Sequence, residues 1–315
     1  MQNWTKLGLI FSTDGEFDWM KTHAMMPVID ILENETARIY FSARDAKGRS
    51  QGAYIEIDLN DPFKLLKISK EPVLKLGQLG AFDDAGIMPT CLVNFENKKY
   101  LYYNGWTLGK NVPFFSFNGV AISDDRGKNF IKKSRGPAVL FSNDIDPYST
   151  FAPYVMNDNG LWKMWYVSLI KWVEEDGKLK HYYNIRYAES VDGINWKREG
   201  KVCIDFASKH EYAIARPFVL KENNIYKMWY SFRESEKNKT YRIGYAESDD
   251  GIDWQRKDAE VGLDVSANGW DSEMIEYSYL YDFKGKRYML YNGNNYGKTG
   301  VGLAVSEKLK VKSCM

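Results

Sequence analysis

The segment Tyr187-Ala-Glu-Ser-Val-Asp-Gly-Ile-Asn-Trp196 recurs as Tyr245-Ala-Glu-Ser-Asp-Asp-Gly-Ile-Asp-Trp254, 58 residues further along the chain. A looser copy, Val120-Ala-Ile-Ser-Asp-Asp-Arg-Gly-Lys-Asn-Phe130, precedes both. Leu303-Ala-Val-Ser306 begins another copy after a second interval of 58 residues. Self-similarity with a period of this size is typical of propeller blades and other repeat architectures. The chain is therefore expected to consist of blade-sized units.

A second, aromatic landmark occurs five times between these copies. In four cases a proline lies 13 or 14 residues before its last aromatic residue, and Tyr277 takes the place of proline in the fifth. Proline is tolerated at the first residue of a strand but not in its middle, so these prolines predict strand starts. The landmarks are Arg38–Phe41, Tyr100–Tyr103, Lys163–Tyr166, Lys227–Tyr230 and Arg287–Tyr291, and the prolines are Pro27, Pro89, Pro153 and Pro217.

Each unit predicts four strands. Turn clusters such as Asn157-Asp-Asn-Gly160 separate the proline from the aromatic landmark, which indicates a hairpin. The Tyr-Ala-Glu-Ser segment adds a third strand, and Asp-Gly leads into a fourth that begins at Trp196 or Trp254. Five such antiparallel units with no persuasive helical periodicity predict an all-β fold, a single five-bladed propeller domain over residues 1–315.

The fifth unit ends after Ser306, before its fourth strand. Asn3-Trp-Thr-Lys-Leu-Gly8 matches Asn195-Trp-Lys-Arg-Glu-Gly200 in the spacing of Asn, Trp and Gly. We therefore expect the N-terminal strand to complete the last blade and to remove an exposed sheet edge.

Composition excludes several classes of function. With 43 basic and 42 acidic residues the net charge is +1, which gives no electrostatic case for nucleic acid or an anionic membrane. The three cysteines, Cys91, Cys203 and Cys314, are an odd number without metal-ligand spacing, so no disulfide framework, metal or cofactor is expected. A reducing, cytoplasmic compartment fits best. The 22 Tyr, 16 Phe and 10 Trp are expected mainly to pack between blades.

The innermost strands of a propeller border its central channel, so residues around the proline positions are expected to converge there. Polar and charged groups interrupt these strand-like segments, and a buried strand end carries such groups only if they are paired or functional. The candidates are His23, Asp83, Asp84, Glu211, Arg216, Asp271, Glu273 and Glu276.

A second set lies three residues past the aromatic landmarks and combines guanidinium, indole and amide groups. Sugar recognition uses this chemistry, because an aromatic face covers C–H surfaces while planar polar groups bind hydroxyls or an anionic substituent. Asp45 or Glu234 are alternative partners for the two arginines, in internal ion pairs. The set is Arg44, Trp106, Arg233 and Asn294.

The repeated pattern of proline, hairpin, Met-Trp-Tyr and Ala-Glu-Ser-x-Asp-Gly-Ile-x-Trp resembles the five-bladed propeller glycoside hydrolases. This superfamily includes arabinanases, invertases, levansucrases and mannoside phosphorylases, and the resemblance covers nearly the whole chain. It is closer to uncharacterised glycosidase-like and phosphorylase-like members than to arabinanases. The resemblance implies acids on separate blades around a funnel, with Asp84 or Asp83 in the second-blade position. Met26-Pro27 stands where arabinanases have Asp-Pro.

The resemblance further implies an enzyme that cleaves or transfers a glycosidic bond, with Asp84 and Glu276 as the acid/base pair and Glu273 and Glu211 as further candidates. Hydrolysis needs two carboxyl groups, about 6.5–9.5 Å apart for inversion or about 5–5.5 Å for retention. A phosphorylase instead uses phosphate, for which Arg44, Arg216, Arg233 and His23 are the candidate donors. The expected partner is an oligosaccharide or glycoside, with phosphate as the alternative acceptor. A non-catalytic carbohydrate-binding propeller and a protein-interaction propeller are the competing hypotheses.

Overall fold

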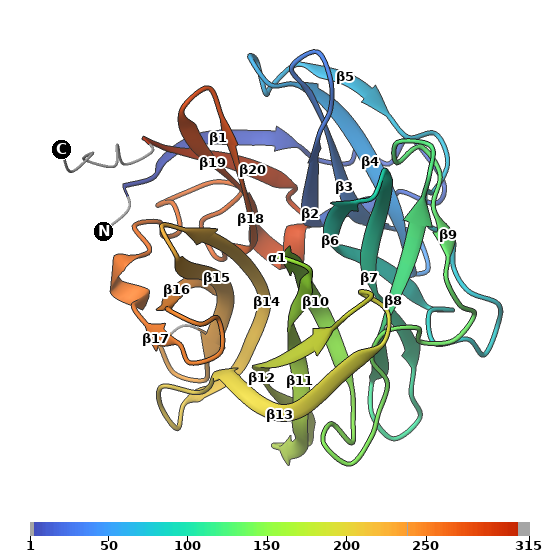
Figure 1. Ribbon diagram of the computed structural model, residues 1–315, viewed down its shortest axis with the longest axis vertical. Coiled ribbons are helices and arrows are strands. Elements are labelled where there is room, and N and C mark those ends of the chain that lie inside the picture. Colours follow the sequence, from blue (N-terminus) through green and yellow to red (C-terminus); the bar gives the residue numbers. More distant parts are fainter. Residues whose placement is uncertain (1–2, 238, 308–315) are drawn as a thin grey trace.

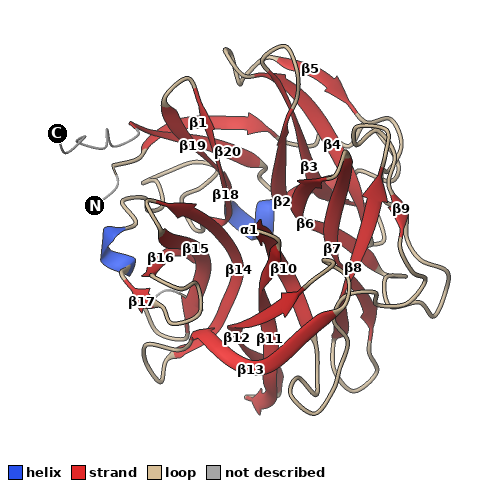
Figure 2. Cartoon of the chain, viewed as in Figure 1, coloured by secondary structure: helices blue, strands red, loops and turns tan. Residues whose placement is uncertain are grey.

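The computed structural model describes residues 3–237 and 239–307, and Cys314 lies outside them. The described chain is built almost entirely from β-strands, as Figure 2 shows, so the predicted all-β class is confirmed. The helical segments of this part of the chain are the 3-10 turn η1 (Asp258–Glu260) and the short α1 (Asn294–Gly297). Within α1, Asn295 and Tyr296 have φ values of 54° and 58°, so α1 is a left-handed turn rather than a regular helix.

The first eight-stranded sheet consists of two antiparallel groups of four strands. The two groups meet at one parallel bridge, between Ser50 and Gly86. The first group contains β2 (Thr22–Ile31), β3 (Thr36–Arg44), β4 (Ser50–Asp58) and β5 (Leu65–Ile68). The second contains β6 (Gly86–Phe95), β7 (Lys98–Leu108), β8 (Phe114–Ser123) and β9 (Ile131–Lys132).

The second eight-stranded sheet repeats this arrangement, with one parallel bridge between Tyr183 and Ala213. Its first group contains β10 (Thr150–Asp158), β11 (Leu161–Glu175), β12 (Lys178–Ser190) and β13 (Trp196–Ile204). Its second group contains β14 (Glu211–Glu222), β15 (Ile225–Glu234), β16 (Arg242–Ser248) and β17 (Gln255–Arg256).

The remaining sheet joins the two ends of the described chain. Its order is β1-β20-β19-β18, and β1 pairs antiparallel with β20 from Thr5 opposite Val305 to Phe11 opposite Val301. Figure 1 shows the blue β1 beside the red β19 and β20. The strands are β1 (Thr5–Phe11), β18 (Glu276–Phe283), β19 (Lys286–Asn292) and β20 (Val301–Glu307).

The first long strands of the groups surround a common centre. In Figure 1, β2, β6, β10, β14 and β18 lie around the middle of the molecule, with α1 among them. Each of these strands contacts the next, and β18 contacts β2. Asn292 fastens the last contact, because its side chain accepts a hydrogen bond from the Met26 amide (2.8 Å) and donates one to the Ala24 carbonyl (2.6 Å).

Every one of these inner strands carries a β-bulge near its proline register. The residue just before that register has positive φ in four strands: Met26 (57°), Ala152 (46°), Arg216 (53°) and Tyr277 (56°). Tyr279 pairs with Leu290 as Phe218 pairs with Trp229, so Ser278 rather than Tyr277 occupies the proline register. By the same test Cys91 pairs with Tyr102, so Thr90 rather than Pro89 occupies this register in the second unit. The sequence alignment was therefore one residue out in the second and fifth units, because spacing alone does not reveal the pairing register.

The repeated Asp-Gly motif forms a tight turn. The Ser190 hydroxyl accepts a hydrogen bond from the Gly193 amide (3.0 Å), and Asp192 accepts bonds from the next two amides. The Gly193 carbonyl in turn accepts a bond from the Tyr102 hydroxyl of the preceding group (2.8 Å). Trp165 donates to Gly251 (2.7 Å) in the same way. The two sequence landmarks therefore recur together because they hydrogen-bond across neighbouring groups.

Candidate functional site

A pocket of about 290 Å³ opens at the centre where the inner strands converge. This volume is at the lower end of the range of about 300–1,000 Å³ typical of small-molecule sites. Each inner strand contributes a lining residue at or next to its register shift. In four strands this residue lies within the bulge, so the irregularity that interrupts strand pairing also turns these side chains inward, whereas Met88 on β6 pairs regularly with Asn104. The contributing residues are Met26, Met88, Ala152, Arg216 and Tyr277.

One side of the pocket wall is aromatic. Trp106 lines it from β7 and donates a hydrogen bond from its indole nitrogen to the Ser50 hydroxyl (3.0 Å), which fixes the plane of the ring. Phe151 packs edge-on against Tyr183 with ring centroids 5.2 Å apart. Flat apolar faces of this kind suit the C–H surface of a sugar ring.

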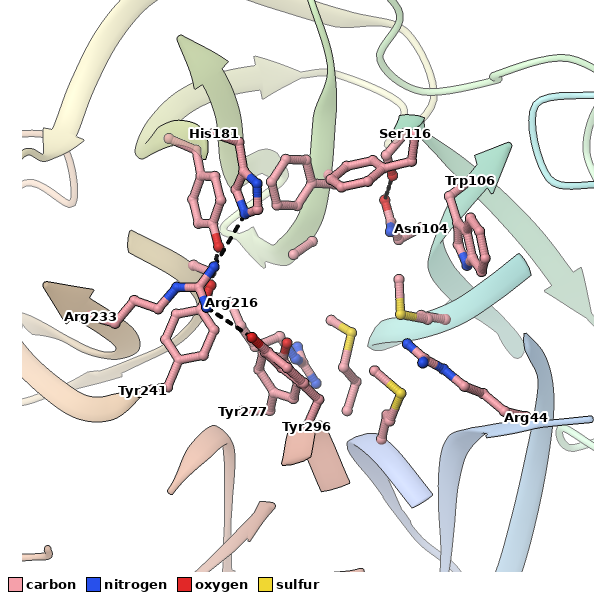
Figure 3. A pocket seen from close by; sticks show the side chains of 18 residues that line it. Arg44, Asn104, Trp106, Ser116, His181, Arg216, Arg233, Tyr241, Tyr277 and Tyr296 are labelled. Atoms are coloured by element: carbon pink, nitrogen blue, oxygen red, sulfur yellow. Dashed lines mark hydrogen bonds between the residues drawn. The ribbon is translucent and has the colours of Figure 1, made fainter. Parts of the chain in front are cut away.

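Arg233, at the end of β15, faces the pocket from the opposite side (Figure 3). Its guanidinium group lies over the rings of Tyr241 (4.8 Å) and Tyr212 (5.0 Å). It donates hydrogen bonds to the Tyr296 hydroxyl (2.8 Å) and to Nε2 of His181 (3.3 Å). The tyrosines and the histidine hold the cation in place without neutralising it.

His181 is a pocket residue that stays neutral. Its ring stacks on Tyr183 with centroids 5.0 Å apart, and it pairs with Trp172 in the part of the β11–β12 hairpin near the turn. Burial, together with the charge of Arg233, lowers the pKa of His181 to about 4. Nε2 therefore remains an acceptor for Arg233 at neutral pH.

Arg216 is fully buried and reaches across the centre from β14. Its terminal nitrogens donate to the Thr90 carbonyl on β6 and to the Pro27 carbonyl on β2 (3.0 Å). Burial lowers the pKa of Arg216 to about 10, so the group remains charged at neutral pH. The guanidinium thus links three inner strands at the pocket floor.

Arg44, at the end of β3, lines the pocket opposite Arg233, and burial lowers its pKa. The predicted ligand residue His23 lies close by without lining the pocket. Burial, followed by the charges of Arg44 and Lys298, lowers the pKa of His23 to about 4. This side of the pocket therefore carries positive charge from arginine and lysine and none from histidine.

Three of the predicted acids belong instead to a repeated scaffold cluster outside the pocket lining. In each cluster the carboxylate forms an ion pair with a cation from the outermost strand of its group. The hydroxyl of a landmark tyrosine donates to the same carboxylate or to a second one bound by that cation. Asp83 pairs with Lys132 (2.6 Å) beside Tyr103, and Asp271 pairs with Lys6 (2.6 Å) beside Tyr291. Glu211 pairs with Arg256 (2.7 Å), which also binds Asp258, the acceptor for the Tyr230 hydroxyl.

Three further candidates also lie outside the pocket lining. Asp84 accepts a hydrogen bond from the Gly80 amide (2.8 Å) within its own loop. The side chain of Glu273 is exposed. Asn294 accepts bonds from the backbone amides of Glu273 (2.8 Å) and Met274 (3.1 Å), so it shapes the loop before β18. The predicted pair of Asp84 and Glu276 is not brought together in the pocket.

Glu276 differs from all the other acids. It is fully buried at the start of β18, and neither carboxyl oxygen has a hydrogen-bond partner among the described residues. Burial raises the pKa of Glu276 well above its usual value of 4.5, against the smaller opposing effects of Arg233 and of the nearby Tyr277 hydroxyl. Burial therefore favours the protonated form of this carboxyl group, which lies next to Tyr277, a lining residue of the pocket.

The sequence argument placed Arg44, Trp106, Arg216 and Arg233 near the channel, and all four line the pocket. It missed other lining residues that come from loops or from hairpin registers without a repeated signature. The bulge residues had a usable signal, since they lie immediately before the prolines. The missed polar and aromatic residues are Asn104, Ser116, Phe114, His181, Tyr183, Tyr241 and Tyr296.

Comparison with known sequences places the chain in a family. The Mycobacterium tuberculosis protein named uncharacterized protein Rv1502 is 41% identical over 304 residues, which cover 96% of this chain and 99% of that protein. The chain belongs to the Rv1502 family. Uncharacterized protein MT1551, from strain CDC 1551 of the same species, matches this Rv1502 family member with the same identity and coverage. No protein-family model matches the sequence.

Solved structures show the fold of the family. A glycoside hydrolase aligns with a TM-score of 0.73 and 15% identity, covering 100% of this chain and 94% of that one. An exo-1,5-alpha-L-arabinanase from a bovine ruminal metagenomic library aligns with a TM-score of 0.61, 16% identity and coverages of 92% and 94%. Zg3597, a family 117 glycoside hydrolase produced by Zobellia galactanivorans, aligns with a TM-score of 0.66 and 12% identity, covering 98% of this chain and 90% of that one. At these identities the likeness establishes a shared fold.

The described residues of this Rv1502 family member form neither a metal-binding cluster nor a membrane-spanning helix. Residues 3–237 and 239–307 contain no group of three or more His, Cys, Asp or Glu side chains arranged to hold a metal ion. Over the same ranges, no helix has the length and apolar character needed to cross a bilayer.

Proposed function

We propose that the chain is a single five-bladed propeller over residues 1–315, closed by β1. The groups of four antiparallel strands and the ring of contacts among β2, β6, β10, β14 and β18 support this architecture. Lys6 supports the closure, because this β1 residue supplies Asp271 with the cation that Lys132 on β9 supplies to Asp83.

We propose further that the protein is an enzyme that cleaves or transfers a glycosidic bond of an oligosaccharide or glycoside in the axial pocket. The observation that carries this proposal is Glu276, a fully buried carboxyl group beside the pocket wall whose oxygens have no hydrogen-bond partner among the described residues and whose pKa is raised by burial. A carboxylic acid kept neutral near pH 7 is what protonation of a leaving oxygen requires. The shared fold with glycoside hydrolases and the aromatic wall around Trp106 are consistent with a sugar substrate.

In this proposal Glu276 acts as the general acid. It directly precedes the lining residue Tyr277 on β18, and the proposal requires its side chain to turn toward the pocket when substrate binds. The acceptor of the glycosyl group is water or phosphate. Two-carboxylate hydrolysis needs a second acid within about 10 Å. Phosphorolysis needs one acid and a cationic phosphate-binding site, for which Arg44, Arg216 and Arg233 are the candidate residues.

The test is product analysis on a panel of oligosaccharides and aryl glycosides, incubated with and without phosphate. Glu276→Gln is expected to lower turnover by roughly 10²–10⁴-fold, the usual contribution of a general acid, with an unchanged circular dichroism spectrum. Asp84→Asn is expected to retain turnover, since Asp84 does not line the pocket. Glu199→Gln, an exposed acid on β13, is the control. Full activity of Glu276→Gln would refute the assignment.

A second candidate function is non-catalytic carbohydrate binding. It is favoured by one specific observation, that no carboxyl group is found among the described residues lining the pocket. Saccharide binding measured by calorimetry, without product after prolonged incubation in either buffer, would establish it in place of the enzyme.

We also propose a reducing, cytoplasmic location. Cys91 and Cys203 are both buried free thiols, and burial raises the pKa of Cys91 to about 12. A thiol held in this form is poorly reactive, so neither residue is prepared for disulfide exchange. Fractionation of cells that express the chain from its natural gene, followed by immunodetection, checks this location.

A further inference from the structure

Buried and half-buried arginines away from the pocket form ion pairs with carboxylates. A buried charge is costly unless a counter-charge and hydrogen bonds compensate it. Buried and half-buried guanidinium groups in the blades accordingly contact carboxylates within 2.6–3.1 Å. These pairs are Arg38 with Glu56, Arg186 and Arg198 with Asp146, Arg256 with Glu211, and Arg287 with Glu222.

The three arginines of the pocket break this rule. Arg44, Arg216 and Arg233 form no ion pair with any carboxylate in the described part of the chain, and the Nε of each is buried without a hydrogen-bond partner. The partners they do have are neutral. Arg216 contacts backbone carbonyls, and Arg233 contacts Tyr296 and His181.

Nothing nearby offsets this positive charge. Lys298 adds to the positive potential at Arg44, as its effect on His23 shows. Glu276 is the acid whose charge would act on Arg233, but its burial favours the neutral form. The pocket therefore carries several uncompensated positive charges inside a wall that is otherwise aromatic and methionine-rich. Such a site attracts an anion and has weak competition from water for it.

We propose that the pocket binds a saccharide carrying a negatively charged group, whose oxygens accept hydrogen bonds from Arg44 or Arg233 while the sugar ring lies against Trp106. This inference rests on the proposed carbohydrate site and names its substrate class. A carboxylate, a sulfate ester and a phosphate ester share the required chemistry.

The placement of the arginines favours an anion attached to a sugar over a free phosphate ion. Figure 3 shows Arg44 and Arg233 on opposite sides of the pocket, with apolar side chains and Trp106 along the walls between them. A free phosphate is held best by donors that converge on one point. Separated cations with an apolar surface between them suit a ligand that has both a charged group and a ring.

The experiment measures binding by calorimetry, without turnover, for matched pairs: glucuronate with glucose, galacturonate with galactose, and glucose 6-sulfate and glucose 6-phosphate with glucose. Inorganic phosphate alone is a separate arm. The acidic member of at least one pair is expected to bind at least tenfold more tightly than the neutral member. Arg44→Gln or Arg233→Gln is expected to reduce this ratio at least fivefold. Arg135→Gln, at an exposed position, serves as the control that keeps the ratio.

Equal binding of acidic and neutral sugars in every pair would overturn the inference. Binding of inorganic phosphate as tightly as the best acidic sugar would also overturn it, because the pocket would then be a site for a free oxyanion. Thermal melting of each variant checks that it is folded, and Arg233→Lys provides a charge-conserving second variant. The enzyme proposal fails separately, because a preserved acid-to-neutral ratio with no product in any incubation leaves this inference standing.

Discussion

Asp146 and Glu276 show how the same functional group takes opposite roles in this chain. Both are fully buried, but Asp146 accepts hydrogen bonds from Tyr166 (2.9 Å) and Ser168 (2.6 Å) and pairs with two arginines. Glu276 has none of these partners. Asp146 therefore links scaffold residues through several donors, whereas burial without such donors raises the pKa of Glu276.

The pH dependence of stability tests the environment of Glu276. Its pKa is 4.5 in the unfolded chain and is raised in the folded protein, so the folded state holds the proton more tightly. Stability from this group is complete below pH 4.5 and is lost as the pH rises toward the folded pKa. The unfolding free energy of Glu276→Gln minus that of the parent is expected to increase from pH 5 to pH 8, because only the parent loses stability. The increase is at most about 1.4 kcal/mol per pH unit.

Urea unfolding at pH 5, 6, 7 and 8 measures this difference. In Glu199→Gln the difference from the parent is expected to stay flat, because that exposed acid is ionised in both states across the range. A flat profile for Glu276→Gln would show that the carboxyl group titrates normally in the folded protein.

At this scale the sequence predicts the scaffold better than the site. Spacing from the aromatic landmarks singled out Arg44, Trp106 and Arg233, the position before Pro217 singled out Arg216, and all four line the pocket. Asp83 and Asp271 follow the blade period, but their role depends on Lys132 and Lys6, which lie far away in the sequence. Which acid is paired is decided by these tertiary contacts.

The Ser-x-Asp-Gly turn is the element that connects neighbouring groups. Its glycine adopts positive φ, and its carbonyl receives the landmark aromatic side chain of the preceding group. Trp229 occupies the equivalent landmark position, and its indole nitrogen has no partner among the described residues. In the fifth unit Ser306 is followed by Glu-Lys-Leu rather than by x-Asp-Gly, so its sequence lacks the motif whose carbonyl accepts this bond in the other units.

A pair of glycine substitutions tests the turn. Gly193 has φ of 74°, and a Cβ atom there would lie 2.9 Å from both the Trp162 ring and the Tyr102 hydroxyl. Gly177, in the exposed β11–β12 turn, has φ of 69° with nothing within 4 Å. Gly177→Ala is expected to cost about 1–2 kcal/mol from backbone strain alone. Gly193→Ala is expected to cost about 1–3 kcal/mol more because of the added crowding.

Chemical denaturation of both variants gives the comparison directly. Equal losses for Gly193→Ala and Gly177→Ala would mean that the space around the first glycine adapts and that the turn is not tightly packed. The hairpins were predictable because turn residues mark them locally. The predicted strand starts were wrong, because the prolines lie within the strands at the register shifts: β2 begins at Thr22, before Pro27, and β14 begins at Glu211, before Pro217. The bulges were not predictable, because the extra residue is seen only in the pairing register.

For the whole molecule, the ring of inner strands makes the two ends of the described chain interdependent. β1 supplies the outer edge of the last sheet, and Lys6 neutralises the otherwise buried Asp271. The similarity between the segments 3–8 and 195–200 was enough to predict this arrangement. The sequence named Arg44, Arg216 and Arg233 as candidate donors to an anion near the centre. It could not predict that no described carboxylate pairs with them, because ion pairing depends on tertiary contacts.

Removal of residues 1–10 tests the contribution of β1. The truncated chain loses the pairing with β20 and leaves Asp271 without its cation, so its melting temperature is expected to fall by more than about 5 °C, since each kcal/mol shifts it by roughly 2–4 °C. Leu7→Ser changes a largely exposed side chain of the same strand and is expected to have little effect. A melting curve unchanged by the truncation would contradict the proposed closure.

The pairing of β1 with β20 also imposes an order on biosynthesis. β1 leaves the ribosome well before its partner strand β20, because almost the whole described chain separates the two. At the usual rate of about 5–20 residues per second, β1 waits roughly 15–60 s without its neighbour. During that interval the earlier groups can fold while the edge of the future last sheet stays open. The nascent chain is therefore exposed to wrong strand pairing at this edge until β20 has been synthesised.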